Sequence, residues 1–434
     1  MGTRSWAHAF FVLAVAATLA AVMSPGAARG AARTVREPAF GLPHIWADTD
    51  LELARENGRE IAKDRLGQII LLARVGRGTI FQVFGPVLPE TIDLDFEARF
   101  TGYTSSELNS MWAHLPARER ELVLEYCKGV NDAIEAVYAK ALPEPIEVGV
   151  LRTFGFGADL FGNATNVSDQ VDPFYVPPGG ADPDRPLAGF QFTPELAMAI
   201  AVLQVRNFGF AGFDETARFG ELQALVAKHG DETGTQIWSD LNFAVDPLAP
   251  TTVPDPTTPG FGVALAQPKA TAALAKLAKS FPRYAWLEGV RRRETRQEAR
   301  AALARRLGAW PMLGSYAWAI SAAKSATGHP WVGGFPQTGI QTPSIMHFAE
   351  NRTRQGIAGV GMEFVGAPFV LIGHTDHVAY TTTTAQLPVV DTFFETIVGE
   401  AGDALRYLDE GTPAPLSSRV EIIRAAGGDI HLDL

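Results

Sequence analysis

The chain has 434 residues, enough for one large domain or two ordinary ones, and 47% of them are hydrophobic, enough to fill a sizeable core. A formal net charge of −11 argues against nucleic-acid binding, for which a basic face is expected. Cys127 is the single cysteine, so an intrachain disulfide and a cysteine-based metal cluster are both excluded.

The first 30 residues are typical of an export signal. Arg4 supplies a positive charge, residues 9–23 form an apolar run, and small residues suited to cleavage follow at 24–28. A membrane-spanning helix needs about 20 apolar residues, so the run is short for an uncleaved anchor. We expect cleavage near residues 26–32, a secreted or periplasmic protein, and no membrane association after the signal is removed.

Three helices are predicted after the signal. Residues 48–50 provide an N-terminal cap for a helix over 51–73, where apolar residues recur at helical spacing. The same spacing predicts a second helix over 116–137, and a Thr-Pro-Glu cap opens a third over 193–208. Residues 159–190, between the second and third helices, are rich in Gly, Asp and Pro, which is typical of a surface loop.

Residues 250–314 differ from the helical region before them. They begin with a Pro/Thr-rich stretch that is typical of extended chain, and arginines are spread among alanines over 289–308. A solvated basic helix explains these arginines better than a lipid- or nucleic-acid-binding helix, because Leu303 and Leu307 alone make a poor apolar face.

From Ser315 onwards the sequence favours strands. Runs of β-branched and aromatic residues predict strands over 315–320, 369–372 and 378–383, and the short stretch between the last two predicts a hairpin. Together with the helices before residue 250, these strands predict an α+β fold. The His-x-x-His pair in the hairpin is interpreted as part of a tight connection and not as a zinc site, because no further ligand is evident.

The junction Gly314–Ser315 is the strongest candidate for chemistry. A serine at the head of a strand, directly after a small residue and a linker-like stretch, suggests a cut site. Cleavage of this bond would give Ser315 a free α-amino group, whose reference pKa is about 7.7–8.0. That amine can accept the proton of its own hydroxyl, so one residue would supply both nucleophile and base.

Short motifs accompany this junction in both halves of the chain. They are Gly41–Asp48, Ala62–Leu66, Gly314–Ile320, Ala326–Pro330, Gly334–Gln337 and Gly366–His374. Their content and order resemble the penicillin acylase (penicillin amidase) family of N-terminal-nucleophile hydrolases. The resemblance covers residues 33–250 and 312–400.

This resemblance implies an αββα sandwich, with a mainly helical α chain and a sheet-rich β chain that form an α/β heterodimer from one precursor. The matching division is a signal peptide over residues 1–30, an α-chain region over 31–255, an excised linker over 256–314 and the N-terminal part of the β chain over 315–434. A late Asn and a late Arg of the family's site have no counterpart in these residues, so we expect an incomplete β chain.

The resemblance also implies catalytic roles. Ser315 is the nucleophile with its α-amino group as base, Gln337 steadies both groups, and the backbone N–H of Thr384 donates to the oxyanion. Four positions match the family's acyl pocket: Phe208, Thr338, Ile372 and Thr382. Penicillin G-type enzymes commonly have Phe at the Thr338 position, so we expect a more open or more polar pocket here.

Calcium is the one metal that the resemblance implies, bound by hard oxygen ligands. The matching positions are Glu215, the backbone carbonyl of Val390 and the carboxylate of Asp391. Pro388 stands where another ligating Asp is expected, so binding should be weak. No organic cofactor is implied.

These features predict a secreted amidohydrolase that cleaves a linear side-chain amide of a small N-acyl substrate, with β-lactam antibiotics among the candidate substrates. Two alternatives stay open. The first is an acylase for acyl-homoserine lactones or lipopeptides, although the quorum-signal acylases of the family typically have His at the Gln337 position. The second is a non-catalytic, truncated remnant that binds small acylated ligands or nothing.

Overall fold

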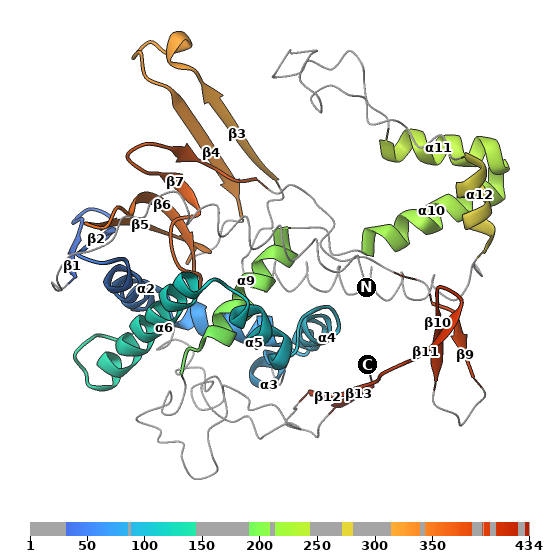
Figure 1. The fold of residues 1–434 in the computed structure, drawn as a ribbon, viewed down its shortest axis with the longest axis horizontal. Helices are drawn as coiled ribbons and strands as arrows, with labels where there is room; N and C mark the ends of the chain where they lie inside the picture. Colours follow the sequence, from blue (N-terminus) through green and yellow to red (C-terminus); the bar gives the residue numbers. More distant parts are fainter. Residues whose placement is uncertain are drawn as a thin grey trace. The chain divides into compact units, whose positions relative to one another are not determined.

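A computed structural model describes residues 32–85, 88–144, 191–208, 213–243, 271–280, 314–338, 343–383, 393, 395–399, 405–423 and 430–433. The chain divides into two compact units. The first unit combines Met1–Gly209 with Ala299–Leu387 and Ile397–Leu434, and the second combines Phe210–Glu298 with Pro388–Thr396. Figure 1 labels the elements of both units.

The first unit contains the three predicted helices, which are confirmed as α2 (Asp50–Arg77), α6 (Ala117–Tyr138) and α9 (Pro194–Phe208). Both α6 and α9 pack against α2. Three shorter helices of this unit were not predicted from the sequence: α3 (Phe81–Phe84), α4 (Thr91–Thr101) and α5 (Ser105–Ala113).

Helix α2 begins and packs as its sequence dictates. Its N-cap is a capping box, in which the hydroxyl of Thr49 accepts a hydrogen bond from the backbone N–H of Glu52 at 3.2 Å. At Gly58 and Gly129 helices α2 and α6 approach so closely that a Cβ on either glycine would overlap the backbone of the other helix. The large buried core of the unit gathers side chains from α2, α6 and α9, with Tyr126 fully buried in it.

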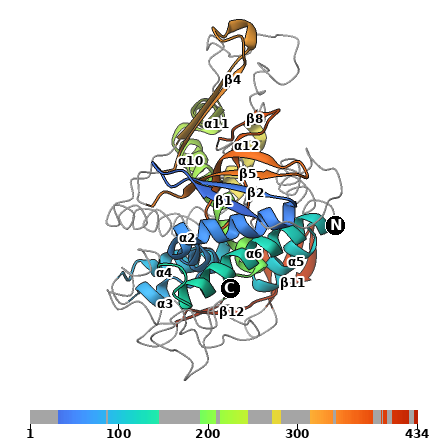
Figure 2. The same ribbon diagram turned by 90° about the vertical axis from the view of Figure 1, so that its left-hand side faces the viewer.

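A six-stranded sheet lies against these helices, as Figure 2 shows. Its strands, in order across the sheet, are β1 (Arg33–Arg36), β2 (Pro43–Ala47), β5 (Met346–Thr353), β6 (Ala358–Phe364), β7 (Ile372–His374) and β8 (Ala379–Tyr380). Strands β2 and β5 pair in parallel, and the other neighbours pair antiparallel. Because β1 and β2 precede residue 314 and the other four strands follow it, this sheet joins the two halves of the chain.

Strands β3 (Gly314–Ile320) and β4 (Trp331–Gln337) form a separate two-stranded ribbon within the first unit. They pair antiparallel along their full length, from Gly314 opposite Gln337 to Ile320 opposite Trp331, and the short helix η1 (Ala322–Lys324) lies in their connection. Most of the large apolar side chains of the ribbon are exposed: Tyr316, Trp318, Ile320, Trp331, Val332 and Phe335.

The remaining elements are small. The first unit also contains a three-stranded sheet of β9 (Ile397–Val398), β10 (Arg406–Asp409) and β11 (Thr412–Pro415), and a pair of β12 (Val420–Ile423) and β13 (Ile430–Asp433). In the second unit, helices α10 (Phe213–His229), α11 (Asp231–Phe243) and α12 (Thr271–Ser280) pack on one another.

The predicted α+β class, with helices first and strands after Ser315, is confirmed. The strand over 315–320 is confirmed as β3, but the bounds predicted for the next two strands are wrong. Phe369 has a φ of 74°, in the left-handed region, which breaks the extended chain before β7 begins at Ile372. The hairpin itself is confirmed, with Gly373 opposite Tyr380.

The predicted signal peptide over 1–30 and the predicted loop over 159–190 lie outside the described residues. The predicted linker over 256–314 contains α12, and the division into α-chain, linker and β-chain regions stays a prediction. In the part of the chain that the structure describes, no helix has the length and apolar character that crossing a membrane requires.

Candidate active site

The predicted nucleophile lies at the start of the ribbon. Ser315 is the second residue of β3 and stands opposite Pro336 of β4. Its hydroxyl oxygen accepts a hydrogen bond from the backbone N–H of Gln337 at 3.3 Å. The fold therefore brings Ser315 and Gln337 together through the main chain, while the role of the Gln337 side chain stays a prediction.

One face of the ribbon carries the groups that surround Ser315. Side chains alternate between the faces of a strand, so Ser315 shares its face with Ala317 and with Gly334, the partner of Ala317. A Cβ at Gly334 would meet the side chains of Thr381 and Ile372. Ile372, a predicted pocket residue, thus contacts this face about 7 Å along the strand from Ser315, at roughly 3.4 Å per residue.

Thr381 adds a polar atom to the same face. Its hydroxyl oxygen is buried and has no hydrogen-bond partner among the residues that the structure describes. Thr338 directly follows Gln337 and is partly buried, whereas Thr382 is exposed. Of the predicted pocket, the structure therefore gathers Thr338 and Ile372 near Ser315 and leaves Thr382 facing solvent.

Several predicted site residues lie outside what the structure describes. Phe208 ends helix α9 and Glu215 lies in helix α10, but neither side chain is described, and Thr384, Val390 and Asp391 fall outside the described residues altogether. The oxyanion donor and the calcium ligands hence stay predictions. Among the described residues no cluster of three or more His, Cys, Asp and Glu side chains is placed to hold a metal ion.

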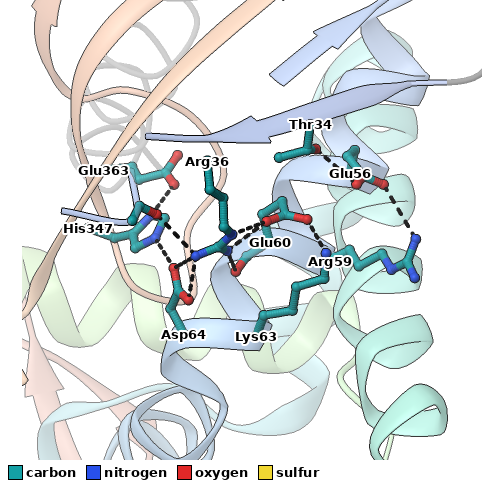
Figure 3. A network of polar contacts seen from close by, with 10 residues as sticks. Thr34, Arg36, Glu56, Arg59, Glu60, Lys63, Asp64, His347 and Glu363 are labelled. Atoms are coloured by element: carbon teal, nitrogen blue, oxygen red, sulfur yellow. Dashed lines mark hydrogen bonds and ion pairs between the residues drawn. The ribbon is translucent and has the colours of Figure 1, made fainter. Parts of the chain in front are cut away.

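A second polar site, the buried charge cluster, lies between β1, α2, β5 and β6 (Figure 3). It consists of Arg36, Glu60, Lys63, Asp64, His347 and Glu363. The guanidinium of Arg36 donates to Glu60 at 2.6 Å and to Asp64 at 2.8 Å, and Lys63 pairs with Glu60. His347 contacts Asp64 through Nε2 at 3.0 Å and Glu363 through Nδ1 at 2.7 Å.

The electrostatics of this cluster favour its charged form. Burial opposes protonation of His347, but the hydrogen bonds to Asp64 and Glu363 outweigh it and raise the pKa of His347 to about 9. Burial also opposes ionisation of Asp64, yet its hydrogen bonds to His347 and Arg36 hold the pKa of Asp64 below its usual value. At neutral pH His347 and Asp64 are accordingly both charged and form an ion pair.

Sequence reasoning singled out Lys63 and Asp64 only as part of a family motif and missed the other four residues of the cluster. One local signal was present, because Asn57, Glu60 and Asp64 recur at spacings of three and four within helix α2. These spacings place three polar side chains on one helical face. Arg36 and His347 carry no such signal, since only the folded sheet brings them to that face.

The sequence profile of the penicillin amidase family matches residues 32–433. Penicillin G acylase of Escherichia coli is 24% identical over 217 residues, which make up 49% of this chain and 21% of that protein. The chain thus matches about a fifth of the length of this curated relative.

Among solved structures, the chain is similar to a thermostable penicillin G acylase from Alcaligenes faecalis. The match has 24% sequence identity and covers 53% of this chain and 100% of that one, with a TM-score of 0.38. The family profile carries the assignment, because it covers nearly all of the sequence after the predicted signal. The chain therefore belongs to the penicillin amidase family.

Proposed function

We propose that this protein is an exported amidohydrolase of the penicillin amidase type, which cleaves a linear amide through an acyl-enzyme on Ser315. The observation that carries the proposal is the position of Ser315 at the start of β3, opposite β4, within a chain that matches the family profile over residues 32–433. Cleavage of the Gly314–Ser315 bond would turn that strand start into a free N-terminus.

The chemistry then follows from the residue itself. The neutral α-amino group of Ser315 accepts the hydroxyl proton as the oxygen attacks the amide carbon. The tetrahedral intermediate collapses when the amine leaves with that proton. Water then attacks the acyl-enzyme and gives its proton to the same α-amino group, so the acyl group leaves as an acid and the Ser315 hydroxyl is restored. Gln337, whose backbone N–H donates to the Ser315 hydroxyl, helps to fix the oxygen for attack. The Thr384 N–H is proposed as an oxyanion donor.

The acyl group of the substrate is proposed to carry a polar atom near the scissile amide. Ile372 supplies an apolar wall, while Thr338 and the buried hydroxyl of Thr381 supply polar character close to Ser315. β-Lactam amides, N-acyl homoserine lactones and lipopeptides all present the required amide bond. A panel of N-acyl anilides with and without oxygen on the acyl chain tests the proposed acyl preference by their kcat/KM values.

Export, assembly as an α/β heterodimer and weak calcium binding belong to the same proposal. They rest on the signal-like first 30 residues, on the cut at Gly314–Ser315 and on Glu215, Val390 and Asp391.

The test of this function is self-cleavage of the purified chain. We expect a fragment whose N-terminal sequence begins Ser-Tyr-Ala-Trp, and we expect Ser315→Ala to remain a single chain. Ser321→Ala is the matched control, because Ser321 is an exposed serine on the same ribbon and should leave cleavage unchanged. Equally efficient cleavage of Ser315→Ala and of the unmodified chain would refute Ser315 as the nucleophile.

A further inference from the structure

Cleavage before Ser315 raises the question of what keeps the two resulting chains together. Strands β1 and β2 would belong to the first chain, and strands β5 to β8 to the second. The parallel pairing of β2 with β5, from His44 opposite Glu350 to Ala47 opposite Thr353, is then a contact between two separate chains. The inference below rests on the proposed function only for the cleavage of the Gly314–Ser315 bond.

The buried charge cluster lies across that contact. Arg36, Glu60 and Asp64 come from the first chain, whereas His347 and Glu363 come from the second. The side chain of His347 is 5% exposed and that of Glu363 is fully buried, so water screens the contact between these two little, whereas Asp64 is 30% exposed and more open to solvent. The bond between His347 Nε2 and Asp64 at 3.0 Å is the ion pair of the cluster that crosses between the chains.

The geometry favours a doubly protonated His347. Its two ring nitrogens each face a carboxylate oxygen, Asp64 on one side and Glu363 on the other. A neutral imidazole donates from one nitrogen only, so it would leave a lone pair against the second carboxylate. Deprotonation would also remove the positive charge that faces these two carboxyl groups, at a side chain that is only 5% exposed, which is costly.

We propose that the buried charge cluster is a proton-dependent joint, which holds the cleaved second chain to helix α2 and strand β1 of the first chain while His347 is charged. The charged and titratable groups that face this joint come from four elements. They are Arg36 on β1, Glu60, Lys63 and Asp64 on α2, Tyr126 on α6 next to Glu363, and Glu363 on β6. Asn57 adds a neutral donor to Glu363 at 2.8 Å.

The direction of the pH dependence follows from the two shifted groups. The pKa of His347 rises from 6.5 to about 9 in the fold, so its contribution is complete below pH 6.5 and is lost as the pH rises through 9. The pKa of Asp64 is lowered, so its contribution is present above pH 3.8 and is lost as the pH falls through the folded value. The joint is accordingly strongest in mildly acidic to neutral solution and opens on the alkaline side.

The experiment uses an engineered cut, so it stays valid even if self-cleavage fails. A specific protease site is placed within residues 256–313 of a Ser315→Ala chain, and the nicked protein is followed by native mass spectrometry and size-exclusion chromatography between pH 6 and pH 10. We expect the two chains to remain together at pH 7 and the dissociation constant to rise by pH 10, by about 10²-fold at most. The full rise in the pKa of His347 sets this upper limit, because the contact of His347 with Glu363 stays within the second chain.

His347→Gln should weaken association at pH 7 and remove most of this pH dependence. His44→Gln is the matched control, because His44 also crosses the β2–β5 contact, bound to Glu350 at 2.5 Å, but is 32% exposed. It should keep the pH dependence of the unmodified chain. Circular dichroism of each uncut variant checks that it folds.

Three results would overturn the joint: dissociation of the nicked chain at pH 7, an unchanged pH profile in His347→Gln, or loss of the profile in His44→Gln. If uncut His347→Gln does not fold, the test uses the unmodified nicked chain and the variant Glu363→Gln instead. Glu363→Gln keeps the contact with Asn57 but removes a charge. A midpoint near pH 9 that shifts downward in Glu363→Gln supports the joint, and a flat profile or an unshifted midpoint refutes it.

Discussion

The buried charge cluster and the Ser315 ribbon are held in place in different ways. His347 and Glu363 are 5% exposed or less and contact groups from other elements far away in the sequence. On the ribbon, Tyr316 is 53% exposed and Trp331 is 51% exposed, and the principal contacts are between β3 and β4 themselves. The cluster therefore depends on the whole unit, whereas the ribbon depends mainly on its own strand pairing.

Because of this difference, substitutions in the two regions should affect different properties of the protein. Substitutions in the core beneath the sheet should lower the free energy of unfolding, because packing there is dense and cavities are costly. Substitutions near Ser315 should change cleavage and turnover with little effect on global unfolding. Replacing a tyrosine by alanine in each region gives the sharpest comparison of their contributions to stability.

The largest expected effect is that of Tyr126→Ala in the core. Tyr126 is fully buried, and its ring packs edge-on against Phe192 at a centroid distance of 6.4 Å. Removing a buried aromatic ring costs about 3–5 kcal/mol, so the urea midpoint of a Ser315→Ala background should fall sharply. Tyr126→Phe is the control, since it keeps the ring and should cost far less. A loss below about 1 kcal/mol in Tyr126→Ala would show that this core is not packed as described.

The elements that could be predicted from sequence are those with local signals. Helices α2, α6 and α9 each have an apolar face within one short window, and α2 begins at a capping box. The strand predicted over 369–372 lies too early in the chain and the one predicted over 378–383 is too long, because the bounds of β7 and β8 are set by pairing with β6 and with each other. The parallel pairing of β2 with β5 joins segments about 300 residues apart and leaves no local pattern to detect.

The candidate site shows the same division. Ser315 and Gln337 could be found from sequence because they belong to one hairpin and to motifs of a known family. Ile372 and Thr381, from a different part of the chain, meet the ribbon at Gly334, which no local pattern predicts. His347 could not be found, because its two carboxylate partners lie on a distant helix and on the next strand.

A smaller effect, and a different kind of effect, is expected for Gln337→Ala. In the processed enzyme, kcat should fall by about tenfold, roughly 1.4 kcal/mol, with a smaller change in KM. The reason is that the side chain of Gln337 is proposed to hold the reacting groups of Ser315 and not to bind the acyl chain, while alanine keeps the backbone N–H that donates to the Ser315 hydroxyl. Steady-state kinetics with a chromogenic N-acyl anilide measures both constants, and the urea midpoint should not move.

Thr338→Ala provides the contrast to Gln337→Ala. Thr338 is the next residue and a predicted pocket position, so its loss should change KM and acyl preference more than kcat. If instead Gln337→Ala changes KM alone, Gln337 binds substrate and the positioning role is wrong. If it lowers the urea midpoint as Tyr126→Ala does, the ribbon is part of the core and the comparison fails.

The smallest expected effect is that of Tyr316→Ala on the ribbon of the 434-residue chain in the Ser315→Ala background. Tyr316 stacks on Phe335 with a centroid distance of 4.6 Å and an interplanar angle of 15°. An aromatic pair of this kind contributes about 0.5–1.5 kcal/mol, and half-exposure of the ring places Tyr316 at the lower end. The urea midpoint should thus shift only slightly, while amide exchange along β3 and β4 should speed up, since local pairing is what holds the ribbon. If Tyr316→Ala lowers the free energy of unfolding as much as Tyr126→Ala does, the ribbon packs in solution against a partner surface. The two regions would then differ in their location in the fold but not in their contribution to stability.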